Sequence, residues 1–516
     1  MNQQSRIIGS LGSILFLGLV SFYWTFVLDD SFIIYRYAQH LAHGQGLAWN
    51  IGQDPVEGYT SFLWVLLNAL GILLQIDPVI FSKIISVLAA IAIIWTLAWA
   101  SQKALWGLAA ILVGAIALSP PFAFLTMQGL ETALTAFLVL SSAIVSRNLF
   151  EKPTPKAIGL WFALVLLGAL SRPDTIAFNA GAGLGLLLTL FLNRDHPTLR
   201  AFLLIGLLFA GLGTLYLIWR IIYFGNFLPT TYYLKLNLGR SVLKREGIKY
   251  IWTFMKNILL PYLVLAGFLF RGPGDKKILF RIIPTGLGLI GFGLYLLTVY
   301  PLQGHLWRFI FPVFPVMLLA LAEGWTHWKP EADWLKNNWL SILMVLLYGI
   351  WTLHLLPATN QETISRTQTD RVLAGKALAG LSGTMLVSEA GALPYYSEWN
   401  SADTFGLTSE EVARHGLTPK FLASLNPDLV MIFDPSGKFA PDSPLEAIIT
   451  QFLIENDFVA VAAIHKSLGQ YHYYFARKDS PLFPETVSRL TRIPGVEYGD
   501  LKNLLPIKQI TIYPDR

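Results

Sequence analysis

Two adjacent carboxylates, Asp29 and Asp30, follow the first long apolar run of the sequence. This run extends from Ile7 to Leu28, which is enough for a helix to cross a hydrocarbon core of about 30 Å. We therefore predict the pair at the far mouth of a membrane span, where carboxylates meet water and substrate. Asp30 as the N-cap of the next helix is an alternative. That role leaves Asp29 at a helix C-terminus, where the macrodipole disfavours an anion, so Asp29 needs another function.

Basic side chains are predicted at the same mouth. Arginine binds phosphate through two parallel hydrogen bonds, and lysine acts as a point charge. A carboxylate that deprotonates a hydroxyl, beside cations that hold a leaving phosphate, can transfer a group from a phosphate donor. Structural ion pairs, or side chains that extend to the lipid headgroups, are the alternative. The predicted phosphate-binding residues are Lys83, Arg172, Arg220, Lys235 and Arg308.

Further polar residues are predicted near this mouth. Glu57 and Glu131 can accept protons or pair with cations, as can the aspartate pair. Carboxylates and His305 are metal-ligand types, but no His-x-x-x-His or Glu-x-x-His spacing accompanies them. We therefore predict no metal site, and a divalent metal remains an alternative without a ligand motif. No glycine-rich phosphate loop follows a strand, so no nucleotide cofactor is expected.

The composition is that of an integral membrane protein. Hydrophobic residues make up 54% and charged residues 14% of the 516 residues, whereas about a quarter are charged in soluble proteins. The 16 Trp and 20 Tyr residues suit the two interfacial belts. The formal charge of +6 is too small to distinguish anionic lipid from phosphate as a partner, and no nucleic-acid partner is expected. The absence of cysteine excludes disulfides and thiolate catalysis.

Hydropathy predicts about eleven membrane spans. The first run has no small-residue cleavage site after it, so we expect an uncleaved helix. Within the loop 29–78, the segments Ser31–His43 and Ser61–Ile76 are predicted to lie on the bilayer. The other predicted spans are Val79–Ala100, Leu105–Leu118, Leu130–Val145, Ala157–Leu170, Ile176–Leu192, Ala201–Ile222, Tyr250–Phe270, Ile282–Tyr300, Phe309–Leu321 and Trp339–Leu356.

Basic residues in the short turns support this assignment, because Lys and Arg collect on the cytoplasmic side. If Ser61–Ile76 does not cross, five basic turns lie on that side and the predicted site lies on the outer face. The loop Tyr223–Lys249 carries cations on the outer side, which either break the rule or bind an anion. The five turns are Ser101–Lys103, Arg147–Lys156, Arg194–Arg200, Arg271–Arg281 and Glu323–Lys336.

Residues 357–516 have the composition of a soluble α/β domain, which follows a membrane domain of residues 1–356. An odd number of spans puts it on the outer face with the predicted site. Its Glu389 and Asp403 are weaker candidates for contacts with a glycan, because such residues often only cap loops. Strands are predicted over Thr384–Ser388, Leu429–Phe433, Phe458–His465 and Tyr471–Ala476, and helices over Ser409–His415, Pro419–Leu425 and Leu445–Glu455.

Several motifs are similar to those of a known family. Asp29–Tyr37 reads Asp-Asp-Ser-Phe-Ile-Ile-Tyr-Arg-Tyr and is the most specific of them. Shorter motifs follow at Gly46–Asn50, Val56–Ser61, Gly129–Thr132, Ser171–Asp174, Tyr223–Lys235, Arg308–Pro312, Ala390–Tyr396 and Asp403–Leu407. Together they resemble bacterial GT-C membrane glycosyltransferases, especially polyprenyl-phosphate-sugar-dependent transferases of the arabinofuranosyltransferase AftB type. The chain departs from that family at Gly304–Trp307, where Gly-Asp-Trp-Met is usual, and at Thr230, where Asn is usual.

The resemblance implies a polyprenyl-phosphate-sugar donor and an active site on the outer face of the bacterial inner (cytoplasmic) membrane. It implies Asp29 as general base and Glu131 as a second acidic residue, and with Asp30 these are the predicted catalytic residues. A pentose such as arabinofuranose and an acceptor glycan, lipid or protein of the envelope are also implied. The predicted substrate-binding residues are Arg36, Glu57, Tyr59, Asp174 and His305.

A transporter or flippase of lipid-linked sugars is the alternative function. Such a protein places charges at mid-span and breaks helices at corresponding places in two halves. This sequence gathers its charges at one mouth instead. A structural envelope protein would leave the aspartate pair and the cations without a function. We therefore expect an α-helical polytopic membrane enzyme with a C-terminal extracytoplasmic α/β domain.

Overall fold

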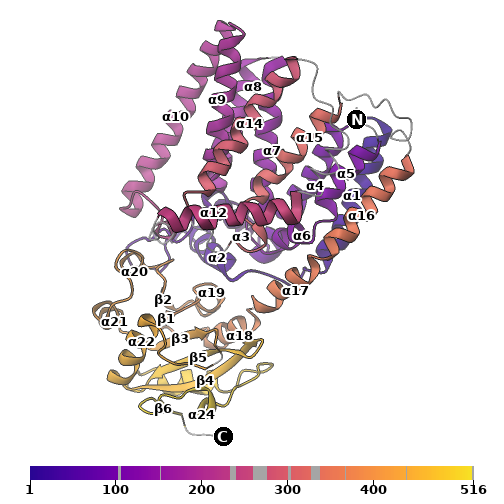
Figure 1. Ribbon diagram of the computed structural model, residues 1–516. Coiled ribbons are helices and arrows are strands. Elements are labelled where there is room, and N and C mark those ends of the chain that lie inside the picture. Colours follow the sequence, from indigo (N-terminus) through magenta and orange to yellow (C-terminus); the bar gives the residue numbers. More distant parts are fainter. Residues whose placement is uncertain are drawn as a thin grey trace.

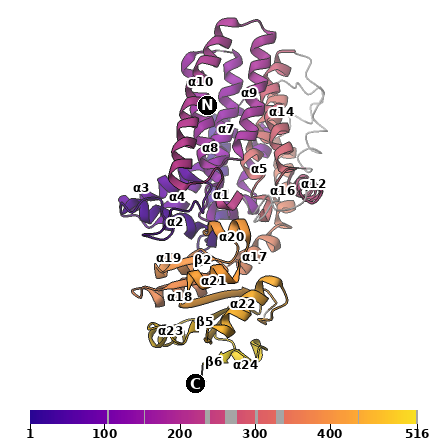
Figure 2. The same cartoon turned by 90° about the vertical axis from the view of Figure 1, so that its left-hand side faces the viewer.

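The computed structural model describes residues 1–102, 106–151, 153–232, 240–259, 276–299, 304–326, 338–366, 368–436 and 438–513. It consists of a helical bundle and a smaller domain built on a β-sheet, which lies at one end of the bundle (Figures 1 and 2). The N-terminus lies toward the opposite end of the bundle (Figure 1). The predicted fold class, a polytopic helical protein with a C-terminal α/β domain, is confirmed.

Five helices of the described residues are long and apolar enough to cross a membrane, or six if one bent pair counts as a span. The five are α1 (Gln3–Ser21), α4 (Pro78–Ala100), α7 (Thr132–Glu151), α9 (Thr175–Leu192) and α10 (His196–Phe224). Shorter helices are α3 (Phe62–Leu73), α8 (Pro155–Ser171), α15 (Phe314–Thr326) and α16 (Asn338–Leu353). The count of about eleven spans stays a prediction.

The predicted span Leu105–Leu118 corresponds to the first helix of the bent pair. The pair consists of α5 (Trp106–Ala117) and α6 (Pro120–Met127), which meet at 48°. Ser119 accepts a hydrogen bond from the backbone N–H of Phe122. A new helix therefore starts at Pro120, a residue that suits the first helical position because it has no N–H to satisfy.

The first span ends earlier than predicted. Helix α1 stops at Ser21, and the segment up to Leu28 forms a turn and a stretch without regular structure instead of continuing the helix. Its Tyr23 and Phe26 are apolar but buried inside the protein, and hydropathy does not distinguish this environment from lipid. The backbone N–H of Leu28 then donates to Gln128 O at 2.9 Å, which fixes the start of the next helix.

The aspartate pair opens helix α2 (Asp29–Ala42) and does not close a span. Leu28 is the N-cap, and no side chain caps this helix end, so the alternative that Asp30 is the N-cap is wrong. The argument that Asp29 sits at an unfavourable helix C-terminus is wrong as well. Both carboxylates lie in the first turn, where the helix macrodipole stabilises anions. Helix α3, which follows in the same loop, has 12 residues and is too short to cross a core of about 30 Å.

The loop predicted over Tyr223–Lys249 contains the first part of another helix. Helix α12 (Arg240–Phe254) continues into a π-helical turn, Met255–Leu259. It lies across the end of the bundle nearer the C-terminal domain, roughly perpendicular to the long helices (Figures 1 and 2). A mixed polar and apolar sequence suits this interfacial position better than it suits a span.

Helix α9 packs against α14 (Lys276–Leu296) through glycine. A Cβ on Gly181 would lie 2.2 Å from Leu287 O, and one on Gly185 would lie 2.5 Å from Pro284 Cα. Glycine therefore lets the two backbones approach closely, as in other membrane helices. This packing brings the start of α9 next to the end of α14, and both contribute to the site described below.

The C-terminal domain is a six-stranded sheet in the order β2-β1-β3-β5-β4-β6. Strand β1 is parallel to β2 and β3, β5 is antiparallel to β3 and β4, and β6 is parallel to β4. The strands are β1 (Thr384–Val387), β2 (Asn400–Asp403), β3 (Leu429–Asp434), β4 (Phe458–Ser467), β5 (Gln470–Arg477) and β6 (Thr511–Ile512). The helices are α17 (Leu356–Ser365), α18 (Thr369–Leu378), α19 (Ala392–Ser397), α20 (Glu410–His415), α21 (Pro419–Leu425), α22 (Pro444–Glu455), α23 (Phe483–Leu490) and α24 (Leu501–Leu504).

Candidate active site

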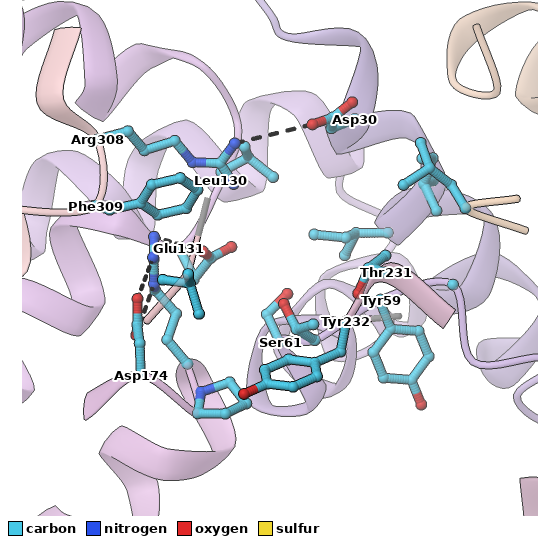
Figure 3. A pocket seen from close by; sticks show the side chains of 18 of the residues that line it. Asp30, Tyr59, Ser61, Leu130, Glu131, Asp174, Thr231, Tyr232, Arg308 and Phe309 are labelled. Atoms are coloured by element: carbon cyan, nitrogen blue, oxygen red, sulfur yellow. Dashed lines mark hydrogen bonds and ion pairs between the residues drawn. The ribbon is translucent and has the colours of Figure 1, made fainter. Parts of the chain in front are cut away.

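A cavity of about 160 Å³ is lined mainly by residues of the bundle, and Figure 3 shows their side chains. The first turn of α2, the segment 58–61, the starts of α7 and α9 and the end of α14 form most of its wall. Leu407, from the loop after β2, completes the wall from the C-terminal domain. Its charged residues are Asp30, Glu131, Arg172, Asp174 and Arg308, all of them predicted for the site from the sequence.

Arg172 is paired with two carboxylates at one side of the cavity. Its Nε donates to Asp174 Oδ1 at 3.1 Å, its Nη2 forms an ion pair with the same carboxylate, and its Nη1 lies 3.6 Å from Glu131 Oε1. All three side chains are buried. With two negative charges around one positive charge, this group is suited to binding hydroxyls and less suited to binding a phosphate.

Arg308 is the less neutralised cation. Its Nη1 lies 3.9 Å from Asp30 Oδ2 across the cavity (Figure 3), and its buried Nε has no hydrogen-bond partner. Buried polar groups are nearly always hydrogen-bonded, so an unsatisfied one calls for an explanation. The ring of Phe309 lies against both Arg308 and Arg172, 5.9 and 5.1 Å from the two guanidinium carbons. An anion in the cavity would pair with the Arg308 guanidinium more readily than with Arg172, because Arg172 already pairs with two carboxylates.

Helix α12 holds the segment that carries Arg308. Tyr250 OH accepts from the backbone N–H of Phe309 at 3.1 Å, and Trp307 Nε1 donates to Thr253 Oγ1 at 3.0 Å. Leu306 and Trp307 adopt φ values of +47° and +60°, a conformation that residues other than glycine rarely adopt. Such strain is concentrated at functional sites. Helix α12 thus fixes the segment that carries Arg308.

Asp30 is the carboxylate of the pair that lines the cavity. Its side chain is 31% exposed, enough to be reached from the cavity. Desolvation raises the pKa of Asp30, the charge of Arg308 opposes this, and the charge of Asp29 adds to it, so that the pKa lies above its ordinary value. A carboxylate with a raised pKa is a better proton acceptor at neutral pH.

Asp29 is held by the C-terminal domain. Its Oδ2 accepts from Gly391 N at 2.8 Å, and its Oδ1 accepts from Ala392 N at 3.0 Å and lies 3.2 Å from Arg371 Nη1. It is not among the residues that line the cavity. The geometry therefore favours Asp30 as the general base, whereas the resemblance implied Asp29.

Glu57 and Arg220 form a buried pair and not a phosphate site. The Nε of Arg220 lies 2.8 and 2.6 Å from the two oxygens of Glu57, and its Nη1 donates to Phe227 O at 2.7 Å. Thr230 Oγ1 donates to Glu57 O at 2.9 Å. Arg220, at the end of α10, thus fixes two loops whose next residues, 58–61 and 231–232, line the cavity.

Replacing Arg220 with methionine should strongly destabilise the protein. The change leaves Glu57 buried without its partner, and breaking such a pair costs about 3–5 kcal/mol. Thermal unfolding in detergent should show a lower Tm for Arg220→Met, with part of the loss regained in Glu57→Met/Arg220→Met. Arg245, which is exposed and paired with Glu246, is the control, since Arg245→Met should leave the Tm unchanged. An unchanged Tm for Arg220→Met would contradict the conclusion that the buried pair of Arg220 and Glu57 stabilises the two loops.

The other predicted residues are dispersed. Arg36 donates to Trp49 O, Pro394 O and Trp399 O at 2.6–2.8 Å, which joins α2 to the C-terminal domain. Lys83 donates to Trp24 O in the turn after α1. His305 Nε2 lies 3.2 Å from Gln128 Oε1. These three do not line the cavity, and Lys235 lies outside the described residues.

Tyr59 lines the cavity, as predicted, with its ring 4.8 Å from that of Tyr37. Sequence reasoning missed Tyr232, Tyr295 and Phe309 of the wall. Tyr232 and Phe309 lie inside or beside quoted motifs, which was a usable signal. Tyr295 lies in an apolar run without a distinguishing neighbour.

In the C-terminal domain, Asp403 caps its own loop. Its Oδ2 accepts from Leu407 N at 2.8 Å and its Oδ1 accepts from Thr408 N at 2.7 Å. Leu407 O in turn accepts from Thr230 Oγ1 at 2.7 Å. The loop-cap alternative thus describes Asp403, which shapes the cavity wall through Leu407. Glu389 belongs to an ionic cluster described below.

Among the described residues, no group of three or more His, Asp or Glu side chains could hold a metal ion. The cavity instead offers a carboxylate, Asp30, opposite the guanidinium of Arg308. The paired carboxylates around Arg172 and the aromatic wall can bind hydroxyls. This arrangement suits the transfer of a sugar away from a phosphate.

Comparisons with known proteins agree with this chemistry. Residues 59–370, more than half of the chain, match the Alg9-like mannosyltransferase family. Residues 360–480 match a domain of unknown function, DUF8728. A search of curated proteins gives no match.

The fold is similar to that of ArnT from Cupriavidus metallidurans bound to undecaprenyl phosphate. The TM-score is 0.60 at 13% identity, and the match covers 92% of this chain and 98% of that chain. ArnT in the apo state gives a TM-score of 0.47 at 15% identity, with 89% and 97% of the two chains covered.

Proposed function

The chain belongs to the Alg9-like mannosyltransferase family, and from this premise we propose that it transfers a sugar from a polyprenyl-phosphate donor to a hydroxyl of an envelope glycan, lipid or protein. The observation that carries the proposal is the cavity in which Asp30 lies 3.9 Å from Arg308. A polyprenyl phosphate is also what the ArnT structure of similar fold holds. A flippase would not need a proton acceptor beside a phosphate-binding cation.

In the proposed reaction Asp30 takes the proton of the acceptor hydroxyl. The hydroxyl oxygen forms a bond to the anomeric carbon while the bond from that carbon to the phosphate oxygen breaks. Arg308 stabilises the charge of the departing polyprenyl phosphate. A phosphate monoester is a good leaving group, so no general acid is required. Leu296 and Val299, two of the apolar residues of the wall, suit the first units of the lipid.

Two classes of donor sugar are proposed, a hexose and a pentose. A lipid-linked hexose follows from the description of the family as mannosyltransferases. A pentose such as arabinofuranose follows from the motifs shared with transferases of the AftB type. The paired carboxylates of Glu131 and Asp174 would bind hydroxyls of either sugar, so the donor must be identified chemically.

We further propose that the site and the C-terminal domain, residues 357–516, face the outside of the bacterial inner membrane. The described cavity and the C-terminal domain lie at one end of the membrane domain, residues 1–356. The N-terminus lies toward the other end, and the short basic turns between spans favour the cytoplasm for that end.

Mass spectrometry of polyprenyl-phosphate sugars and envelope glycans tests the function. In the native host, deletion of the gene should cause one lipid-linked sugar to accumulate while a glycan loses the same residue. Adding back the wild-type gene should reverse both changes. The accumulated lipid and the deficient envelope fraction then serve as donor and acceptor for the purified protein in nanodiscs. Unchanged lipid and glycan pools, together with no transfer in nanodiscs, would contradict the proposal.

The rate of transfer should depend on pH through Asp30. Since the pKa of Asp30 is raised, kcat should fall as the pH drops through a value above the ordinary carboxyl pKa of about 4. A pH profile of kcat with the purified protein measures this. A flat profile down to about pH 4 would mean that a carboxylate with a raised pKa is not the base.

A further inference from the structure

A cluster of charged side chains from the C-terminal domain surrounds Asp29. Arg371, at the start of α18, is 1% exposed and lies 3.2 Å from Asp29 Oδ1. It also forms an ion pair with Glu389, from the loop after β1, and lies 3.8 Å from Asp370. One guanidinium thus joins the first turn of α2 to two elements of the other domain.

The other residues of the cluster keep Arg371 in place. His472, on β5, is buried between Asp370 and Glu389, with its two ring nitrogens 2.6 Å from an oxygen of each. Both carboxylates raise the pKa of His472 against the effect of burial. Lys466, on β4, lies 3.3 Å from Glu389. Each anion of the cluster therefore has a cation beside it, and this network keeps Arg371 in place.

The backbone next to Asp29 leaves no room for movement. A Cβ on Gly391 would lie 2.0 Å from Asp29 O and 2.5 Å from Asp29 Cγ. The amides of Gly391 and Ala392 both donate to the Asp29 carboxylate. The carboxylate of Asp29 is thus bound by two backbone amides and by Arg371.

We propose that Arg371 is a positioning residue of the transfer reaction: by holding Asp29 it fixes the first turn of α2, so that Asp30 faces Arg308 across the cavity. Successive residues of a helix point about 100° apart, so fixing one of the pair fixes the direction of the other. The inference rests on the proposed function of the site. It assigns to the C-terminal domain a part in catalysis that does not require contact with the donor.

Arg371 also balances the charge next to the base. The groups that act on Asp30 are Arg308 and Arg366, which favour its charged form, and Asp29 and Glu389, which disfavour it. Without Arg371, the negative charges of Asp29 and Glu389 would be less compensated and the pKa of Asp30 would rise further. Position and charge can be separated, because Gly391→Ala displaces Asp29 without changing any charge.

The test measures kcat, donor KM and the pH profile of the purified protein in nanodiscs. Arg371→Gln should lower kcat by about 10- to 100-fold, since a misplacement of about 1 Å costs up to that much, while the donor KM stays within a few-fold. The acid limb of its pH profile, where kcat falls as the pH drops, should move to higher pH, because the charge of Asp29 loses its compensation. Asp29→Asn/Arg371→Gln should return the limb to the wild-type position. Arg371→Lys should leave the acid limb of the pH profile at the wild-type position. Gly391→Ala should lower kcat without moving the acid limb.

Arg414→Gln is the matched control. Arg414 bonds to Glu410 and to Asn226, which joins the C-terminal domain to the bundle without contacting the aspartate pair. Its kcat and pH profile should equal those of the wild type. The inference is overturned if Arg371→Gln keeps the wild-type kcat and pH profile, or if Arg414→Gln changes both equally. If Arg371→Gln does not fold, Gly391→Ala with wild-type kcat overturns it. No transfer by the wild type would instead refute the proposed function.

Discussion

Replacing Asp30 with asparagine should lower kcat for sugar transfer by about 10³-fold, since a general base typically contributes about 10² to 10⁴. Asparagine keeps the size of the side chain but cannot take the proton of the acceptor hydroxyl. The donor KM should change little, because the lost interaction belongs to the transition state. Release of polyprenyl phosphate by the purified protein measures both quantities.

Asp29→Asn is the matched control, one residue away and with the same change of atoms. It weakens the contacts with Arg371 and the Gly391 amide but removes no group from the cavity. We expect a loss of about tenfold or less, as for a modest misplacement. A loss of 10³-fold in Asp29→Asn with near-normal Asp30→Asn would assign the base to Asp29, as the resemblance implies.

Arg308→Gln should lower kcat by about 10²-fold, which is typical for the loss of one group that stabilises developing charge. Its guanidinium lines the cavity and lies 3.9 Å from the carboxylate of Asp30, so its charge is available to a departing phosphate. Arg308→Lys should fall between glutamine and the wild type, because lysine keeps the charge without the forked donors. The same release assay applies to both variants.

Arg245→Gln serves as the control for Arg308, because the side chain of Arg245 is 74% exposed on the same helix that positions the Arg308 segment. Its kcat should not change. If Arg308→Gln retained normal kcat while Arg172→Gln lost activity, the phosphate would bind at the paired arginine and the two assigned roles would be reversed.

Sequence reasoning placed the elements whose limits are local. The start of α4 is fixed by Asp77, which accepts from Val79 N, and the end of α10 by Gly225 with φ +71°. Helix α21 has the predicted bounds because Thr418 caps it just before Pro419. Caps, proline and glycine act within a few residues, so they can be recognised without the rest of the fold.

Tertiary contacts decided the remaining features. The turn after α1 is as apolar as a span although the protein buries its Tyr23 and Phe26, so hydropathy did not show where the helix ends. Asp29 and Asp30 contact different arginines, Arg371 and Arg308, and both arginines are remote from the pair in sequence. Five of the predicted site residues could be grouped by charge, but only the fold determined that Arg36, Lys83 and Arg220 stabilise the structure outside the cavity.

The contacts between Asp29 and the C-terminal domain have a consequence for biosynthesis. Asp29 and Ala392 are 363 residues apart in the chain, and synthesis at about 5–20 residues per second separates their emergence by about 20–70 s. During that interval the start of α2 exists without its partners, and its acidic pair is held only by the bundle. In a nascent chain the first turn of α2 therefore lacks the contacts with Ala392 and Arg371 that hold Asp29 in the finished protein, and these contacts form only after the C-terminal domain has been made.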